Sequence, residues 1–306
     1  MLNLVVDRFA RFALVLLATS VVVFLLLRFA GDPGSVLLPA QASPEDRAAL
    51  REAYGLDRNV IAQYGAYLWH AVQGDLGISW GYRRPAVEVV LERLPATLEL
   101  VFGGLIVALA ISIPLAMLAV RRAGGQLDAF IMSVGLVARA IPNFWFGTLL
   151  ILLFSVRLGW FPTSGAGTVA HMVLPIATIA FFYVAEFTIV LRSSLLEALE
   201  SDHIRAAAAR GTPPRVVMLR HGLRNSLNPL VSVIGVNFGA LLGGTVIVEA
   251  VFAWPGVGRL AVEAVTRTDF PVIQATVLIL AAIIALGNMV TDLLYGVLDP
   301  RIRRAQ

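Results

Sequence analysis

Six apolar stretches constrain the fold of this chain more than any other feature of its sequence. They lie near residues 9–30, 97–120, 128–157, 172–196, 229–252 and 272–297. About 20 helical residues are enough to cross the hydrocarbon core of a bilayer. Only 14% of the residues are charged, where a soluble domain carries about a quarter. The pattern therefore predicts an all-α polytopic membrane protein with about six transmembrane helices.

The first apolar run has two interpretations, a cleavable signal peptide or a retained signal anchor. Its apolar part is longer than a typical signal-peptide core, and the "GDPGS" that follows does not have the small-x-small pattern of a cleavage site. We therefore expect a retained anchor.

Arginines gather on one side of the predicted spans, and the chain contains no lysine. If six spans alternate, arginines precede the first span, follow the second, separate the fourth from the fifth and follow the sixth. Such an excess of positive charge marks cytoplasmic loops, so we expect both termini in the cytoplasm. The arginines concerned are Arg8, Arg11, Arg121, Arg122, Arg205, Arg210, Arg215, Arg220, Arg224, Arg301, Arg303 and Arg304.

This topology divides the chain into three parts. Residues 1–30 form an N-terminal tail with the first span, residues 31–94 an extracytoplasmic helical segment, and residues 95–306 a five-helix transmembrane core with a cytoplasmic loop at 197–228. The middle part is either a small helical cap or a landing surface for an external partner.

Three short helices are expected in the segment 31–94. The first begins at Pro44, is capped by Ser43 and stops at Gly55. The second runs from about residue 59 to 73, and the third from Pro85 to about Leu94, ending at Pro95. The second helix is expected to carry Ile61, Tyr64, Leu68 and Val72 on one face.

The cytoplasmic loop contains a short alanine-rich helix. Ser201 or Asp202 can cap it, it runs from about residue 203 to 210, and Gly211 suits its C-terminal end. Thr212 is expected to cap a second helix that starts at two prolines. A helix of about eight residues is not stable alone, and its small side chains anchor poorly to lipid. An ordinary basic loop would explain the arginines but not the capped alanines, so we favour docking onto another protein.

Several segments are similar to those of a known transporter family. They are "GDLGISW" and "LERLPATLEL" before the second span, "IPNFWFGTLLILLF" in the third, "LRSSLLEALESDHIRAAAARG" leaving the fourth, "GGTVIVEAVFAWPGVGRL" around the end of the fifth, and "DLLYGVLDPRIR" near the C-terminus. With these segments the chain resembles, over essentially its whole length, permease subunits of ATP-binding-cassette (ABC) importers of the dipeptide, oligopeptide and nickel group. The long segment after the first span resembles the B-type, dipeptide permease-like member of the permease pair.

The resemblance implies a type I ABC importer permease fold in the cytoplasmic (inner) membrane of a prokaryote. It implies transport of short peptides, with nickel, haem or another small solute as alternatives. The implied partners are a second homologous permease in a heterodimer, two cytoplasmic ATP-binding subunits and an extracytoplasmic solute-binding protein, besides substrate and lipid, and no nucleic acid.

The chain lacks the residues needed to hydrolyse ATP itself. A phosphate-binding P-loop requires a lysine, and the chain has none. With no cysteine and four scattered histidines, thiolate and zinc sites are also not expected. We therefore expect no enzyme activity and no bound cofactor, with ATP and Mg on the partner subunits.

The movement of those subunits must then reach this chain through a protein–protein contact. The residues expected to couple to the ATPase are Ser201, Asp202, His203, Ile204, Arg205, Ala206, Ala207, Ala208, Ala209, Arg210 and Gly211. A smaller contact is expected at Arg121–Asp128. Arg205 stands where the importers' general motif has glutamate, so no particular acidic partner is inferred.

Polar and small residues within the spans are candidates for the translocation pathway. Arg139 and Glu186, which also depart from the family's pattern, either form a structural ion pair or line the pathway. Glycines at 235, 239 and 243 indicate close packing within one bundle or a seam with the partner permease. The candidates are Arg139, Asn143, Glu186, Asn237, Gly243, Gly244 and Glu249.

Two other classes of protein are compatible with six spans. An ion-coupled secondary transporter relies on intramembrane acids, of which the chain has few clearly at depth. A non-transporting assembly subunit needs no flexible positions in its spans, yet Pro142 lies within the third. We favour the importer subunit over both.

Overall fold

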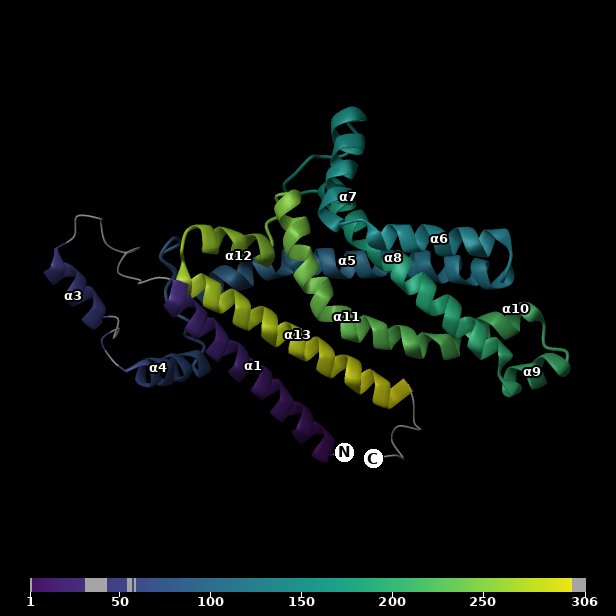
Figure 1. The fold of residues 1–306 in the computed structure, drawn as a ribbon, viewed down its shortest axis with the longest axis horizontal. Coiled ribbons are helices and arrows are strands. Elements are labelled where there is room, and N and C mark those ends of the chain that lie inside the picture. Colours follow the sequence, from purple (N-terminus) through teal and green to yellow (C-terminus); the bar gives the residue numbers. More distant parts are fainter. Residues whose placement is uncertain (1, 31–42, 54–56, 58, 299–306) are drawn as a thin grey trace. The chain divides into compact units, whose positions relative to one another are not determined.

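The computed structural model describes residues 2–30, 43–53, 57 and 59–298. Within these residues the secondary structure is helical, apart from an isolated β-bridge between Ile78 and Pro85 (Figure 1). The chain forms two compact units, Met1–Ala96 with Pro255–Leu286, and Thr97–Trp254 with Gly287–Gln306. The helices α5 (Ala86–Arg121) and α13 (Phe270–Leu298) contribute to both.

The first unit contains α1 (Leu2–Ala30), α3 (Pro44–Ala53), α4 (Val60–Val72) and α12 (Val257–Thr266), with the beginnings of α5 and α13. Its apolar core lies where α12 meets the beginnings of α5 and α13. The buried residues there are Ala86, Val89, Val90, Val257, Leu260, Ala264, Val272 and Ala275.

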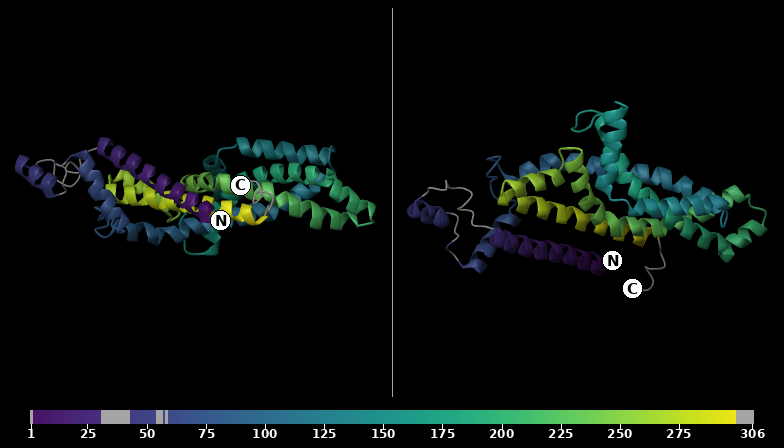
Figure 2. Two further views of the ribbon diagram at one scale, coloured as in Figure 1. Left: turned by 90° about the horizontal axis from the view of Figure 1, so that it is seen from below. Right: turned by 45° about the horizontal axis from the view of Figure 1, so that its top comes forward.

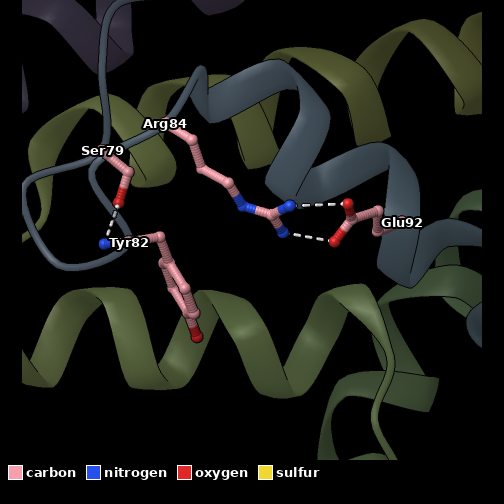
Figure 3. A network of polar contacts seen from close by, with 4 residues as sticks. All are labelled: Ser79, Tyr82, Arg84 and Glu92. Atoms are coloured by element: carbon pink, nitrogen blue, oxygen red, sulfur yellow. Dashed lines mark hydrogen bonds and ion pairs between the residues drawn. The ribbon is translucent and has the colours of Figure 1, made fainter.

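A buried carboxylate holds the loop that leads into α5. Asp269, which directly precedes α13, accepts hydrogen bonds from the Ser79 hydroxyl and from the backbone N–H groups of Trp80 and Gly81. The Ser79 oxygen accepts a further bond from the N–H of Tyr82 (Figure 3). A negative charge is favourable at the N-terminal end of a helix, so Asp269 stabilises both the loop and the start of α13.

The same loop is also tied to α5 at its surface. Arg84 donates two hydrogen bonds to the carboxylate of Glu92 (Figure 3), and this bond raises the pKa of Arg84 above its usual value. Both side chains are largely exposed, so the pair contributes little to stability.

The second unit is organised around α8 (Val169–Glu200). It packs against α6 (Gln126–Ala140), α7 (Asn143–Leu150) and α11 (Leu223–Val251), and the views in Figures 1 and 2 agree that α6 runs alongside it. The remaining elements are the π-helices η1 (Ile151–Arg157) and η2 (Val217–Gly222) and the short helices α9 (Asp202–Ala209) and α10 (Pro214–Val216).

Close packing of α5 on α8 depends on two glycines. A Cβ atom added at Gly103 would lie 2.5 Å from Ile176 Cδ1, and one at Gly104 would lie 2.5 Å from Ile179 Cγ2. Real contacts are never so short, so the two helices approach only because these positions lack side chains.

We expect Gly104→Val to destabilise the protein by about 2 kcal/mol, because the new side chain must push the helices apart. The measurement is the thermal unfolding midpoint of the purified protein in detergent. The matched control is Gly65→Ala in α4, where an added Cβ meets nothing within 4 Å. An unchanged midpoint for Gly104→Val would show that α5 and α8 do not pack this closely.

The expected all-α fold with about six membrane spans is confirmed. Among the described residues, five helices are long and apolar enough to cross a membrane, and there are six spans if the bent pair at 126–157 is counted as one. The candidates are Arg8–Phe29, Ala86–Arg121, Val169–Glu200, Pro214–Val251 and Phe270–Thr291, with the bent pair between the second and third of these.

The third span is not the single helix that the apolar run 128–157 indicated. It breaks after α6, and α7 with η1 turns by 101°. Pro142 explains the break, because the residue before a proline is driven out of the helical region and Ile141 is extended, with ψ 124°.

Two of the predicted short helices in the segment 31–94 are confirmed and one boundary is wrong. α3 begins at Pro44, where Ser43 Oγ accepts the N–H of Asp46, and α4 is capped by Asn59. The expected stop at Gly55 lies outside the described residues. The third helix does not end at Pro95, because α5 continues through it to Arg121.

The face predicted for α4 is only partly correct. Ile61 and Val72 lie together on one exposed side of the helix, as predicted. Tyr64 does not share this side, because it is partly buried against α1. The predicted cap at Thr212 is also wrong, since α10 starts at Pro214 and Pro213 occupies its N-cap position without a side-chain hydrogen bond.

Candidate functional site

The alanine-rich helix predicted in the loop after α8 is present as α9, Asp202–Ala209. The Ser201 carbonyl accepts the N–H groups of Ile204 and Arg205, while the Ser201 hydroxyl bonds to the carbonyl of Ala198 instead of capping α9. Gly211, with φ +86°, reverses the chain directly after the helix. This left-handed conformation favours glycine, and it explains why the helix ends here.

Of the described side chains of α9, one is large and apolar, and it holds the helix in place. Ile204 is only 2% exposed, in a helix that packs against α8 and η2. η2 in turn packs closely on α8, since a Cβ added at Gly222 would lie 3.3 Å from Leu199. α9 is therefore supported from within the protein, and needs no lipid anchor.

The outward face of α9 is small and basic. Its described exposed residues are Asp202, Arg205, Ala206 and Ala209, followed by Arg210 and Gly211, and Ser201 at its start is partly exposed. Such a surface lets another backbone approach closely and offers guanidinium groups to acidic side chains at the edge. The side chains of His203, Ala207 and Ala208 lie outside the described residues.

The expected second contact, Arg121–Asp128, is tied to α8 by an ion pair that sequence reasoning missed. Asp128 is buried and accepts two hydrogen bonds from Arg192 and one from the N–H of Gly124. Arg192 lies in the part of α8 that leads into α9. The loop before α6 and the helix before α9 are thus joined directly.

Three of the pathway candidates meet in one polar cluster. Glu186 Oε1 in α8 lies 4.0 Å from Arg139 Nη2 in α6 and accepts a hydrogen bond of 3.3 Å from Asn237 in α11. The side chain of Glu186 is 13% exposed and that of Arg139 44%. Among the described residues, Glu186 Oε2 is buried without a hydrogen-bond partner. A buried acceptor left in this state is costly, and such groups are often functional.

A small open pocket of about 170 Å³ lies one helical turn from this cluster along α8 and α11, and on the far side of the break after α6. Asn143 follows Arg139 by four residues, Tyr183 precedes Glu186 by three, and Leu241 follows Asn237 by four. The full lining is Asn143, Ile179, Phe182, Tyr183, Ala240, Leu241 and Gly244.

The other two candidates lie apart from the polar cluster. Gly243 is exposed and does not line the pocket. Glu249 is fully buried and accepts a hydrogen bond of 2.6 Å from Thr97 of α5. This hydrogen bond joins α11 to α5, and it is a contact that spacing along the chain could not reveal.

Among the described residues, no group of three His, Asp or Glu side chains could hold a metal ion. Transmembrane helices, an intramembrane polar cluster and a supported basic helix between two spans define a membrane permease.

Comparison with known proteins identifies the family. Residues 112–304 match the binding-protein-dependent transport system inner membrane component, and residues 1–101 match the N-terminal part of such membrane components. The chain belongs to this family of ABC importer permeases.

Relatives match over nearly the full length. The oligopeptide transport system permease protein AppB of Bacillus subtilis is 38% identical over 94% of this chain and 95% of its own length. The glutathione transport system permease protein GsiC of Escherichia coli K12 is 37% identical over 99% of both chains.

Solved structures confirm the fold. A chain of the inward-facing MetNI methionine ABC transporter superposes with a TM-score of 0.57 at 18% identity, covering 69% of this chain and 96% of its own. A chain of an amino acid ABC transporter with histidines gives 0.52 at 19% identity, with 70% and 94% covered. The type I importer permease fold expected from the sequence is therefore present.

Proposed function

We propose that this chain is one transmembrane subunit of an ATP-driven importer of short peptides. The observation that carries the proposal is its full-length similarity to two permeases named for oligopeptide and glutathione transport. The names of these two relatives lend no support to nickel or haem as substrate.

The complete importer contains, in this proposal, a second homologous permease, two cytoplasmic ATP-binding subunits and an extracytoplasmic solute-binding protein. ATP and Mg bind to the ATP-binding subunits, and this chain catalyses no reaction. Both termini lie in the cytoplasm. The distribution of arginines supports this orientation.

The exposed face of α9 docks onto an ATP-binding subunit and transmits its movement. The support for this role is the combination of an inward anchor, Ile204, with an outward surface of alanines and arginines. Closure of the ATPase pair upon ATP binding turns the channel outward, and hydrolysis resets it, as a rigid-body switch between two states.

The pocket and its adjoining polar cluster line the translocation pathway. Arg139, Glu186 and Asn237 present a cation, an anion and an amide, the groups that complement the charged ends and the backbone of a peptide. Asn143 and Gly244 belong to the pocket wall.

Uptake into proteoliposomes by the complete importer tests the proposal. We expect ATP-dependent accumulation of labelled short peptides, and none when this chain is left out. Accumulation of nickel or haem instead of peptide would reject the substrate. Accumulation by this chain alone on an ion gradient would reject the class of transporter.

Glu186→Gln is expected to lower peptide uptake about tenfold, because Arg139 loses the negative charge beside it. A tenfold loss corresponds to a change of about 1.4 kcal/mol in the free energy of the transport step. The measurement is the initial uptake rate at equal amounts of assembled importer. The matched control is Glu197→Gln, which neutralises an exposed acid of the same helix. Equal uptake by the two variants would remove Glu186 from the pathway.

A further inference from the structure

The helix α4 carries an apolar face that no described part of its unit covers. Ile61 is 78% exposed, Trp69 68% and Val72 83%. These positions are spaced by eight and three residues, so they lie on one side of a helix. None of the 13 residues of α4 is buried. A face of this size and kind would be unfavourable in water.

The opposite face of α4 packs on α1. Tyr64 and Tyr67 contact the ring of Phe24, with ring centroids 5.3 and 5.8 Å away. Tyr64 also shares a hydrogen bond of 2.8 Å with Ser20, and Arg28 donates to the side chain of Gln63. The contacts on α1 are spaced by four residues, which places them along one stripe of that helix.

These contacts place α4 near one end of the candidate span of α1. The candidate span of α1 is Arg8–Phe29, and Figures 1 and 2 both show α4 beside the end of α1 remote from the N-terminus. The crossing point at Phe24 is five residues before the end of the candidate span, which is about 7.5 Å along a helix. Helices that lie in the membrane interface are buried to about this depth, roughly 5–10 Å.

The composition of α4 suits the same location. Its sequence, VIAQYGAYLWHAV, contains His70 and no other ionisable group except the two tyrosines. His70 lies near the C-terminal end, 3.6 Å from Asp75. In contrast, α3 of the same unit, PEDRAALREA, is half charged, as expected of a helix in water. Tryptophan and tyrosine are also the residues enriched at membrane interfaces.

We infer that α4 is an interfacial helix that lies in the leaflet at the C-terminal end of α1, with Ile61, Trp69 and Val72 inserted among lipid acyl chains. The occupant of this face is lipid, because the face lies beside one end of an apolar candidate span and α4 contains no Asp, Glu, Lys or Arg. Exposed apolar residues of α1 lie in the same part of that span, on the side of α1 opposite its contacts with α4; they are Val22, Leu26 and Phe29. The segment between α1 and α5 is therefore partly a membrane element rather than only a soluble cap.

The absence of cysteine allows this inference to be tested with single spin labels. The variants are Ile61→Cys, Trp69→Cys and Val72→Cys, each in the complete importer reconstituted into phosphatidylcholine vesicles. The measurement is the collision rate of the label with oxygen, which concentrates in acyl chains, and with a water-soluble nickel chelate. The matched controls are Glu45→Cys in α3 and Gln73→Cys directly after α4, both at exposed positions.

We expect the ratio of oxygen to nickel collisions at residues 61, 69 and 72 to exceed that at residue 45 several-fold. The same ratio at all positions would show that α4 lies in water. Low collision rates with both reagents at the α4 positions would show that a protein partner covers the face. Either result overturns the inference, and neither depends on which solute the importer carries.

A separate experiment tests whether the contact with α1 sets the depth of α4 in the membrane. Tyr64→Ala removes both the hydrogen bond to Ser20 and the ring contact with Phe24. Combined with Trp69→Cys, it is expected to raise the nickel collision rate at residue 69, because α4 loses its support at this depth. An unchanged rate would show that the contacts of Tyr64 with α1 do not hold α4 at this depth.

Discussion

Replacing Gly211 by valine is expected to lower ATP-dependent uptake about tenfold or more while the subunit still inserts and assembles. Gly211 has φ +86° directly after α9, a conformation that costs a non-glycine residue about 2 kcal/mol and a β-branched one still more. The turn that ends α9 would then shift, and with it the surface proposed to meet the ATP-binding subunit. ATP hydrolysis would persist but would no longer be coupled to transport.

The measurement is the ratio of peptide transported to ATP hydrolysed in proteoliposomes. Gly211→Asn is the matched control, because asparagine tolerates the left-handed conformation and no atom lies within 4 Å of a Cβ added at this position. We expect the asparagine variant to keep most of its uptake. Normal coupling in the valine variant would reject the proposed role of α9.

Removing the carboxylate of Asp128 is expected to cost about 2 kcal/mol of stability, because the partly buried Arg192 loses its charged hydrogen-bond acceptor. In Asp128→Ala, Arg192 loses two hydrogen bonds and the Gly124 N–H loses one. The expected result is a large fall in the thermal unfolding midpoint of the purified importer in detergent.

Two further variants separate the ion pair from general damage. Glu92→Ala breaks the exposed pair with Arg84 and is expected to cost less than about 1 kcal/mol. The double variant Asp128→Arg with Arg192→Asp is expected to recover part of the lost stability. If Asp128→Ala unfolds at the same temperature as Glu92→Ala, the pair does not join α6 to α8.

Much of the architecture could be predicted from local patterns. Long apolar runs indicate spans whatever their neighbours are, since every residue of a span must suit the bilayer. The capping residues Ser43 and Asn59 and the glycine after α9 act within a few residues of chain, so their positions were also predictable. The sequence shows the proline at which the third span breaks, but it does not show the 101° turn that follows. The backbone direction after a break depends on what the next helix packs against.

The candidate site was predictable only as a set of residues. Arg139, Glu186 and Asn237 stood out as polar groups within apolar runs, yet their meeting point depends on the packing of α6, α8 and α11. The sequence offered no reason to separate Glu249 from them, and the structure pairs it with Thr97 of α5 instead. Asp128 and Arg192, 64 positions apart, were not connected by any local signal.

The sequence by itself therefore determined that this chain is helical, spans a membrane and belongs to the importer permeases, because composition, spacing and family motifs are properties of short stretches. The tertiary structure alone decided which charges meet, where Pro95 is tolerated inside a helix, and that Ile204 faces inward. Those outcomes depend on contacts between residues far apart in the chain, and such contacts exist only once the helices have packed.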